Sequence, residues 1–344
     1  MGMPARVALL GYGLAGSVFH APFIATTDGL ELAVVVTGND ERKAQAQSEH
    51  PGTTVLPTSD EVFERADELD LVVVATPNRT HVSLARAALE AGLPVVLDKP
   101  FARTADEGRA LVDAARERGL MLTVFQNRRW DGDFLTLRGL IEEGRLGRVH
   151  RLESRFERWR PQPGGGWRER AGAEEGGGLL LDLGSHLVDQ ALQLFGPVRE
   201  VYAELDVRRE GAQVDDDDFM ALEHESGVRS HLWMSALSAE RAPRFRALGN
   251  RAAFIKHGLD IQEEALRTGR SPADPGWGEE PRERWGWLVV DGEVQEVPTV
   301  PGSYGAFYTG VARSLRDAVP PPVDPLDSVA VLEVLDAARE QAAD

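Results

Sequence analysis

Residues 6–16 of this chain read Arg-Val-Ala-Leu-Leu-Gly-Tyr-Gly-Leu-Ala-Gly. A short apolar run meets a G-x-G-x-x-G turn, and a helical pattern follows at once. Gly11 permits the tight turn, Gly13 lets the backbone approach a pyrophosphate, and Gly16 lets the helix pack close to its strand. The free N–H groups at the start of that helix favour an anion. Because a strand and a helix flank the turn, the stretch predicts a dinucleotide-binding fold rather than a plain glycine turn.

Four further apolar runs follow this one within the first 124 residues, at 32–36, 71–75, 95–97 and 121–125. Helical patterns lie between them, for example at 82–91 and 105–118. Short strands that alternate with helices predict a doubly wound parallel sheet. Ligands of such sheets bind beyond the carboxyl ends of the strands.

The pattern changes after about residue 125. A helix is expected at 134–143, and a last helix at 325–342. Residues 258–287 are rich in Gly, Pro, Trp and charge, which favours a long irregular loop or insertion. We interpret the four carboxylates of 215–218 as a solvated strand start rather than a cation site. Long alternating runs predict an antiparallel sheet, with strands at 149–158, 198–207, 219–224, 228–235 and 245–253.

Composition narrows the function classes. The formal charge of −18 repels phosphate backbones, so nucleic acid is not expected as a partner. The absence of cysteine excludes disulfides, iron–sulfur clusters and thiolate catalysis. No apolar run approaches the length of a membrane span, and no signal-peptide pattern precedes the first strand. We therefore expect a cytoplasmic protein without a membrane partner.

Lysine is scarce: of 38 basic residues only Lys43, Lys99 and Lys256 are lysines. Lysine can lose its proton when it is desolvated, whereas arginine cannot. Lys99 follows the apolar run 95–97 and precedes Pro100, which places it at the ligand-bearing edge of the predicted sheet. We interpret Lys99 as functional, and we attribute the presence of lysine at positions 43 and 256 to chance.

A second candidate group lies at 176–189. Three glycines precede a helical stretch with Asp182 and His186 four residues apart, so both side chains share one face. Asp189 falls on that face one turn later. A carboxylate beside an imidazole suits proton transfer at neutral pH. A capped helix start with a satisfied histidine is the structural alternative, and a metal site is not expected because further ligands are lacking.

The second strand ends in Val36-Thr37-Gly38-Asn39, without the carboxylate that usually grips the ribose in NAD sites. Arg42 follows within one helical turn, where it could pair with a 2′-phosphate. Asp40 and Glu41 count against this reading. We therefore favour NADP and keep NAD as the alternative.

Other polar groups are candidates because they follow predicted strands or stand at the domain junction. The expected cofactor-binding residues are Gly11, Tyr12, Gly13, Leu14, Ala15, Gly16, Thr37, Asn39, Arg42, Thr76, Pro77, Asn78, His81, Asp98, Lys99, Pro100, Gln126, Trp167 and Arg168. The expected substrate-binding residues are Lys99, Asn127, Arg128, Asp182, His186 and Tyr304. For His81, a purely structural place against the next helix is an equal alternative.

Taken in order, these motifs resemble the glucose–fructose oxidoreductase and inositol dehydrogenase (Gfo/Idh/MocA) family over nearly the whole chain. Asp98-Lys99-Pro100 resembles its Glu-Lys-Pro motif, with Asp in place of Glu, and 176–186 resembles its second-domain motif. The segments 19–22 and 126–131 look closest to the NADP-dependent scyllo-inositol dehydrogenase branch. Because aspartate has one methylene fewer than glutamate, the Asp98 side chain is shorter than the corresponding side chain of the family motif.

The resemblance implies a Rossmann domain and a second α/β domain with a large, open, mainly antiparallel sheet often used to form oligomers. We place the domains at 1–124 and 125–324, with 325–344 as a helix that is a candidate for packing back on the first domain. The resemblance also implies that Lys99, Asp182 and His186 are catalytic. A homodimer or homotetramer formed through the open sheet is the expected assembly.

The expected activity is hydride transfer between a nicotinamide and a secondary hydroxyl or carbonyl of a cyclitol, polyol or sugar, scyllo-inositol being one candidate. The protein's task is to align carbon and cofactor and to manage the proton. Two alternatives stay open: a cofactor-binding sensor without turnover, and a reductase of an imine or pyrrole. The Lys–Asp–His set argues against a sensor, which needs no acid–base groups.

Overall fold

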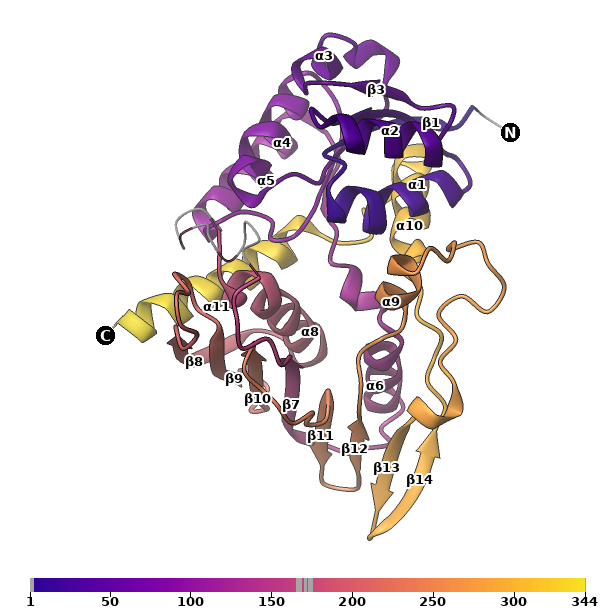
Figure 1. Ribbon diagram of the computed structural model, residues 1–344. Coiled ribbons are helices and arrows are strands. Elements are labelled where there is room, and N and C mark those ends of the chain that lie inside the picture. Colours follow the sequence, from indigo (N-terminus) through magenta and orange to yellow (C-terminus); the bar gives the residue numbers. More distant parts are fainter. Residues whose placement is uncertain (1–2, 165–168, 170–171, 173–175, 344) are drawn as a thin grey trace. The chain divides into compact units, whose positions relative to one another are not determined.

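The protein is described by a computed structural model covering residues 3–164, 169, 172 and 176–343 (Figure 1). The chain divides into two compact units. The first unit contains Met1–Asn127, Gln262–Trp277 and Ser303–Val329, and the second contains Arg128–Ile261, Gly278–Gly302 and Ala330–Asp344. Neither unit is continuous in sequence. The domain boundaries expected from the sequence stay a prediction.

The first unit is built on a six-stranded parallel sheet in the order β3-β2-β1-β4-β5-β6. This order is that of a doubly wound, dinucleotide-binding sheet, which confirms the predicted fold class. β3 was not expected, because it begins with an exposed threonine and lacks the continuous apolar run of β5. The strands are β1 (Ala5–Leu10), β2 (Leu30–Val36), β3 (Thr54–Leu56), β4 (Leu71–Val74), β5 (Val95–Leu97) and β6 (Leu122–Val124).

Among the helices of the first unit, α5 begins and ends where its caps predict. The Thr104 side chain accepts a hydrogen bond from the Glu107 N–H at the start of α5, and Gly119 ends the helix at a φ of 65°. The helices are α1 (Ala21–Thr26), α2 (Asp40–Glu49), α3 (Asp60–Phe63), α4 (His81–Glu90), α5 (Ala105–Arg118), α9 (Gln262–Arg267) and α10 (Gly305–Asp317), with short turns η1 (Ala15–His20), η2 (Ala66–Glu68) and η3 (Asn78–Thr80).

The second unit contains an eight-stranded sheet in the order β14-β13-β12-β11-β7-β10-β9-β8. Only β7 and β10 pair in parallel, so the predicted mainly antiparallel sheet is confirmed. The strands are β7 (Val149–Glu157), β8 (Val198–Asp206), β9 (Asp217–His224), β10 (Arg229–Ser235), β11 (Phe245–Gly249), β12 (Ala253–Lys256), β13 (Gly286–Val290) and β14 (Glu293–Val297).

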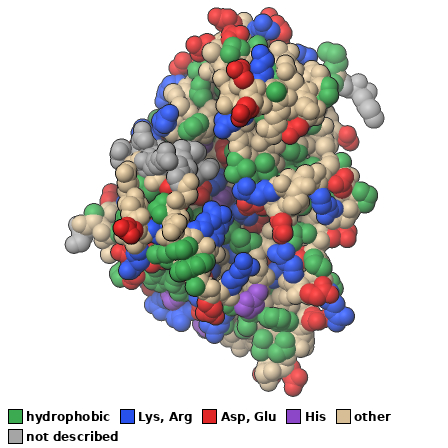
Figure 2. Space-filling view, viewed as in Figure 1, with side chains coloured by type: hydrophobic (Ala, Val, Ile, Leu, Met, Phe, Trp, Pro, Cys, Tyr) green, Lys and Arg blue, Asp and Glu red, His purple; other side chains and the backbone are tan. Residues whose placement is uncertain are grey.

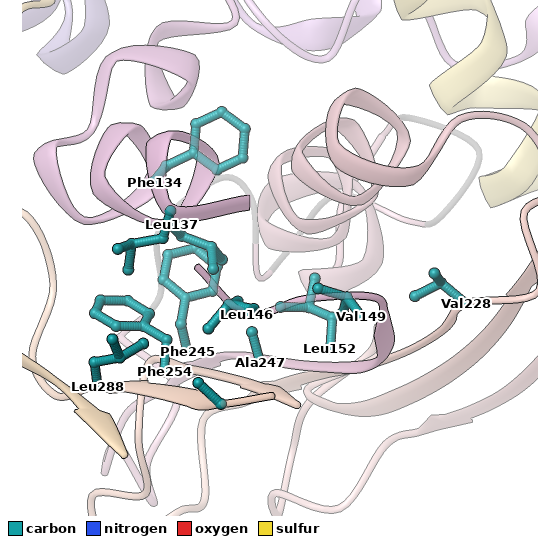
Figure 3. Packing of buried hydrophobic residues seen from close by; sticks show 12 residues of the cluster. Phe134, Leu137, Leu146, Val149, Leu152, Val228, Phe245, Ala247, Phe254 and Leu288 are labelled. Atoms are coloured by element: carbon teal, nitrogen blue, oxygen red, sulfur yellow. The ribbon is translucent and has the colours of Figure 1, made fainter. Parts of the chain in front are cut away.

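One face of this sheet packs against helices and forms the core of the unit. Leu137 of α6 (Gly132–Glu142) faces Phe245 and Phe254 of the sheet (Figure 3). α8 (Ser185–Phe195) covers the neighbouring strands, and the second half of α11 (Pro325–Ala343) lies beside it. The cluster comprises Phe134, Leu137, Leu140, Leu146, Val149, Leu152, Val228, Phe245, Ala247, Ala252, Phe254 and Leu288.

The opposite face of the sheet carries a row of aromatic side chains. Phe219 of β9 lies between Tyr202 of β8 and Trp233 of β10, with ring centroids 6.4 and 5.0 Å away. The Arg155 guanidinium of β7 lies 3.9 Å above the Trp233 ring. In the lower part of Figure 2, hydrophobic, basic and histidine side chains reach the surface together over these strands. This face remains half-exposed.

Two expectations about loops were wrong. The expected strand at 245–253 is two strands, β11 and β12, that turn at Gly249. A Cβ there would lie 2.0 Å from the Leu146 carbonyl oxygen, so only glycine fits. The segment 258–287 is not wholly irregular, because it contains α9, η7 (Arg282–Arg284) and the start of β13.

The interpretation of 215–218 as a solvated strand start was also wrong. Asp216 is fully buried, accepts hydrogen bonds from the Arg208 and Arg209 N–H groups, and pairs with the Arg209 guanidinium at 2.8 Å. Asp218 is 3% exposed, and Asp215 accepts the Leu180 N–H at 2.7 Å. Asp215 and Asp216 are structural because their carboxylates accept backbone N–H groups of neighbouring segments.

The sequence offered no reason for a lysine at position 256, but the surroundings of Lys256 give it a structural role. Its side chain is 1% exposed, and Nζ lies 3.0 Å from the Glu280 carboxylate. Nζ also donates to the His257 carbonyl oxygen at 2.8 Å. Removing one partner of such a buried pair leaves an uncompensated charge. Lys256 is therefore a structural residue of the second unit.

No helix in the part of the chain that the structure describes is long and apolar enough to cross a membrane.

Candidate active site

The glycine turn follows β1 in the first unit, and its three glycines meet different surroundings. A Cβ on Gly11, whose φ is +98°, would lie 2.6 Å from the Ala75 carbonyl oxygen. A Cβ on Gly16 would lie 2.0 Å from the Gly11 carbonyl oxygen. A Cβ on Gly13 would meet only the Arg42 guanidinium, at 3.8 Å. Gly11 and Gly16 thus shape the turn, whereas Gly13 leaves room beside it.

The helix opened by the turn begins with η1, a π-helical turn that runs into α1. Tyr12 is buried, and its hydroxyl donates to the Glu49 carboxylate at 2.6 Å, which ties the turn to the end of α2. Leu14 is exposed and Ala15 is half-exposed. The turn is therefore fixed from behind by Tyr12 and open at Gly13 to Ala15.

The end of β2 carries the groups expected to select the cofactor. Asn39 caps α2 by accepting the Arg42 N–H at 2.9 Å, and its own N–H donates to the Thr37 hydroxyl at 3.3 Å. The Arg42 guanidinium lies above Gly13, as the built Cβ shows. A positive charge therefore stands beside the glycine turn, at the place where a carboxylate would select NAD.

β4 ends in a loop that contains Thr76, Pro77 and Asn78. Asn78 is 6% exposed and begins η3. The Thr76 hydroxyl is hydrogen-bonded to the Thr80 hydroxyl at 2.7 Å. The His81 ring is fully buried, with Nε2 2.8 Å from the Thr76 carbonyl oxygen and Nδ1 2.9 Å from the Pro100 carbonyl oxygen. His81 therefore joins this loop to the next one.

β5 ends at Asp98-Lys99-Pro100. The Asp98 carboxylate accepts the Lys99 N–H at 2.9 Å, the peptide bond before Pro100 is cis, and Lys99 is half-buried. Burial alone would raise the pKa of the Asp98 carboxyl. The nearby His20, whose Nε2 lies 3.6 Å from the carboxylate, together with His81 and Lys99, outweighs burial and brings this pKa below its ordinary value. Asp98 is thus an anion beside the proposed catalytic lysine.

β6 is followed by Gln126 and Asn127, which are 2% and 6% exposed. The Gln126 N–H donates to the Val124 carbonyl oxygen at 2.8 Å. The first unit thus brings together the residues expected after β1, β2, β4, β5 and β6 at one edge of one sheet. This is the edge at which doubly wound sheets bind ligands.

Asp182 and His186 lie in the second unit. Asp182 is in η6 (Leu180–Gly184), a π-helical turn, and His186 is in the first turn of α8. The expected single α-helix is therefore a π-to-α junction, and the wider π turn still keeps residues four apart about one turn apart. Asp182 is half-buried and His186 is 4% exposed.

Two arginines of this unit lie against Phe156, whose ring also contacts His186. Asp189 forms a buried, bidentate ion pair with Arg129, with its shortest contact at 2.6 Å. The Arg128 guanidinium lies 4.8 Å from the centre of the Phe156 ring and the Arg244 guanidinium 4.4 Å from it, and the His186 ring is 6.3 Å from the same ring. Gln190 links the two arginines by donating to the Arg128 carbonyl oxygen and accepting from Arg244.

Several groups in this unit and the first were missed by the sequence analysis, namely His20, Phe156, Gln190, Arg244 and Tyr308. Only His20 had a signal in the sequence, because it lies in the segment 19–22 that resembles the family, although that resemblance assigned it no role. Tyr304, expected to bind substrate, is fully buried at the start of α10. Trp167 and Arg168 lie outside the described residues. Lys99 belongs to the first unit, and Asp182 and His186 belong to the second.

Among the described residues, no group of three or more His, Asp or Glu side chains is arranged to hold a metal ion. The donors at the sheet edge are instead backbone N–H groups, hydroxyls, amides and two cations. That set suits the phosphates and ribose of a dinucleotide. The fold and this edge define an NAD(P)-dependent oxidoreductase of the Rossmann type.

Comparisons with known proteins give the family. Residues 5–126 match the model of an oxidoreductase family with an NAD-binding Rossmann fold, and residues 134–255 match the Gfo/Idh/MocA C-terminal domain. The chain therefore belongs to the Gfo/Idh/MocA family of oxidoreductases, as its motifs predicted.

Similar proteins cover nearly the full length. The NADP(+)-dependent scyllo-inositol 2-dehydrogenase IolW of Bacillus subtilis is 36% identical over 97% of this chain and 93% of its own. The uncharacterized oxidoreductase YdgJ of Escherichia coli is 42% identical over 98% and 96%. The solved structure of yvaA from Bacillus subtilis has a TM-score of 0.93, 35% identity, and coverage of 99% and 97%.

Proposed function

We propose that this protein transfers a hydride between NADP and a secondary hydroxyl or carbonyl of a cyclitol, polyol or sugar, with scyllo-inositol as the first candidate. The observation that carries the proposal is that the G-x-G-x-x-G turn and Lys99 lie at the same edge of one parallel sheet. The name of the relative IolW supports both the substrate class and the cofactor. The protein would act in the cytoplasm on a small-molecule substrate, without nucleic acid or membrane.

The preference for NADP is supported by the end of β2. Thr37 and Asn39 are neutral, and the Arg42 guanidinium lies over Gly13, where it can pair with a 2′-phosphate. Bidentate pairing with phosphate is a property of the planar guanidinium. In this proposal the cofactor phosphates lie against Gly11 to Gly16, and its ribose lies near Thr37 and Asn39.

The remaining predicted residues have the following roles in the proposal. The cofactor, when bound, supplies the hydride acceptor, and Thr76 to Asn78, Asp98 to Pro100 and Gln126 line its nicotinamide half. His186 accepts the proton of the substrate hydroxyl, and Asp182 orients the imidazole. The Lys99 ammonium stabilises the oxygen as charge develops on it. Asn127, Arg128 and Tyr304 complete the substrate side, and Trp167 with Arg168 would cover the cofactor.

Assembly through the open sheet belongs to the same proposal. The face opposite the core carries Tyr202, Phe219 and Trp233 in contact, with Tyr202 48% exposed. Aromatic rows of this kind are enriched at interfaces between subunits. We therefore propose a homo-oligomer, a dimer or tetramer, in which this face is covered by another copy of the chain.

Initial rates at 340 nm, with a panel of cyclitols, polyols and sugars and with both cofactors, test the proposal. We expect turnover with at least one secondary alcohol and a kcat/KM that favours NADP. Thr37→Asp should repel the 2′-phosphate and shift the ratio toward NAD, and Thr58→Asp, outside the β2 end, is the control. A tenfold preference of the wild type for NAD would refute the cofactor assignment. Cofactor binding without turnover of any alcohol would favour a sensor or an imine reductase.

A further inference from the structure

The two chain neighbours of Lys99 are each held by a buried histidine from another segment of the first unit. His20, from η1, faces the Asp98 carboxylate. His81, from α4, faces the Pro100 carbonyl oxygen. Both imidazole rings are fully buried. Lys99 itself is half-buried between these two anchored residues.

The His20 contact is oriented by Tyr308 of α10. The Tyr308 oxygen lies 2.6 Å from His20 Nδ1. Burial, with the negative charge of Asp98, raises the pKa of the Tyr308 hydroxyl well above its ordinary value. The hydroxyl therefore stays protonated, and its hydrogen bond with Nδ1 fixes the orientation of the ring. The other ring nitrogen, Nε2, lies 3.6 Å from the Asp98 carboxylate, and the ring packs against Phe125 with the ring centroids 4.5 Å apart.

The His81 contacts connect two loops at the ligand edge. Its two ring nitrogens lie 2.8 and 2.9 Å from the carbonyl oxygens of Thr76 and Pro100. A carbonyl oxygen only accepts hydrogen bonds, so a ring nitrogen that carries a proton donates to the carbonyl oxygen it faces. The Asp98 carboxylate interacts electrostatically with the same ring. The loops after β4 and β5 are thus joined through one side chain.

We infer that His20 and His81 are positioning residues that fix the backbone on both sides of Lys99 and thereby direct its ammonium toward the substrate. The inference rests on the proposed role of Lys99 in hydride transfer. Asp98 carries the effect of His20, because its carboxylate also accepts the Lys99 N–H at 2.9 Å. Pro100 carries the effect of His81. Neither histidine needs to touch the substrate or the cofactor.

A buried histidine that only stabilises the fold is the alternative, and the chain provides a matched control. His224, in the second unit, is also fully buried, with Nδ1 2.8 Å from the Gly196 carbonyl oxygen and Nε2 2.8 Å from the Ser230 hydroxyl. His224→Leu removes as many hydrogen bonds as His81→Leu. It measures the effect of losing a buried histidine that is not linked to Lys99.

The first test does not depend on activity, and the scarcity of lysine makes it direct. A brief pulse of an amine-acylating reagent followed by mass spectrometry reports separately on Lys43, Lys99 and Lys256. Lys43 is exposed and serves as the reference, and the buried Lys256 reports any opening of its unit. In His20→Leu and His81→Leu we expect the Lys99-to-Lys43 ratio to change at least about threefold, since the surroundings of the ammonium change. In His224→Leu the ratio should stay at the wild-type value.

The second test measures turnover. Because small misplacements of a reacting group cost roughly 10²-fold in rate, kcat should fall about 10- to 100-fold in His20→Leu and His81→Leu. His20→Gln keeps a donor near the Nε2 position and should recover most of the loss. His224→Leu should keep the wild-type kcat.

An unchanged labelling ratio at Lys99 in the folded His20 and His81 variants would overturn the inference. Equal kcat losses in all three leucine variants would also overturn it, because the histidines would then act only through stability. If instead Lys99→Arg keeps full turnover while the labelling ratio changes as expected, the positioning is upheld and the proposed role of Lys99 fails.

Discussion

Asp98 and Asp218 are both buried carboxyl groups, and their surroundings give them different charge states. Around Asp98, the nearby His20, together with His81 and Lys99, outweighs burial and lowers the pKa. Around Asp218, burial dominates, and the neighbouring Asp215 and Asp217 add to it, which raises the pKa to about 11. Asp98 is therefore an anion at neutral pH, and Asp218 is a neutral acid.

Asp218→Asn should stabilise the protein at neutral and alkaline pH. The folded pKa of Asp218 lies above its unfolded value of 3.8, so its stabilising effect is complete below about pH 4 and is lost as the pH rises toward 11. Asparagine does not titrate and therefore lacks this loss. At pH 8 we expect a gain of more than about 1 kcal/mol in the free energy of unfolding, the scale of one pKa unit.

Urea denaturation of both proteins between pH 5 and 9 measures this effect. The stability difference should grow with pH, and Asp217→Asn, at a partly exposed neighbour, is the control. A difference that is constant with pH, or a destabilised variant throughout, would show that Asp218 is ionised in the fold.

A functional residue could be predicted from the sequence where the signal came from its immediate neighbours in the chain. Lys99 was identifiable because lysine is rare and because it follows a strand. The surroundings of Lys99 were not, because His20 reaches Asp98 from η1 and is oriented by Tyr308, 288 positions further along the chain. Hydrogen bonds between distant segments leave no period in the sequence. The burial of Asp216 was missed although Arg208 and Arg209 lie only eight and seven positions earlier, because the turn that brings them back leaves no period in the sequence either.

At the scale of elements, we predict opposite effects for alanine substitutions at two glycines of the G-x-G-x-x-G turn. Gly16→Ala places a methyl group 2.0 Å from the Gly11 carbonyl oxygen and should cost at least about 2 kcal/mol of stability. Gly13→Ala meets only the flexible end of Arg42, at 3.8 Å, so it should fold normally. Its methyl group would instead occupy the space proposed for the pyrophosphate.

Thermal unfolding and cofactor titration separate the two variants. Gly16→Ala should lower the Tm, whereas Gly13→Ala should keep the Tm and lose affinity for NADP. Tight NADP binding by Gly13→Ala would move the pyrophosphate away from this turn.

For the η6–α8 junction, we predict that the effects of substitutions at Asp182 and His186 on the rate are coupled. In the proposed mechanism Asp182 and His186 share one proton, so the two side chains act as a unit. Kinetics of Asp182→Asn, His186→Ala and the double variant should show that the double variant is scarcely slower than His186→Ala, because losses within one unit do not add. Multiplicative losses would mean independent action. Wild-type rates in both single variants would leave only a structural helix start.

Helices and strands with a strong hydrophobic periodicity or a continuous apolar run were predictable from the sequence. Strands that are mostly polar or exposed were not. α5 was predicted at its observed bounds, because a cap and an apolar face coincide. β14 was missed because most of its residues are exposed and its sequence lacks a buried alternation. The π-helical turns η1 and η6 were predicted as ordinary helix, since a residue inserted into a helical turn does not change the residue types around it.

At the scale of the whole molecule, the chain returns twice to its first unit, at 262–277 and 303–329, whereas the sequence suggested a return only by the helix at 325–344. Phe23 of α1 packs against Trp277 and Tyr304, with ring centroids 6.0 and 6.2 Å away. The Gln262 side chain accepts hydrogen bonds from the Trp277 indole and the Tyr304 N–H. These returning segments bring Tyr308 to His20. The surroundings of Lys99 thus depend on residues near both ends of the chain.

The central claim is that Lys99 takes part in the reaction and does not merely line the cofactor. Lys99→Arg keeps the positive charge and loses the compact, titratable ammonium. The most direct measurement is kcat of this variant, with the NADP dissociation constant measured on the same sample. We predict a kcat at least about 10²-fold below the wild type, the scale of an acid–base contribution, with the NADP dissociation constant nearly unchanged. Wild-type turnover in Lys99→Arg would contradict the account.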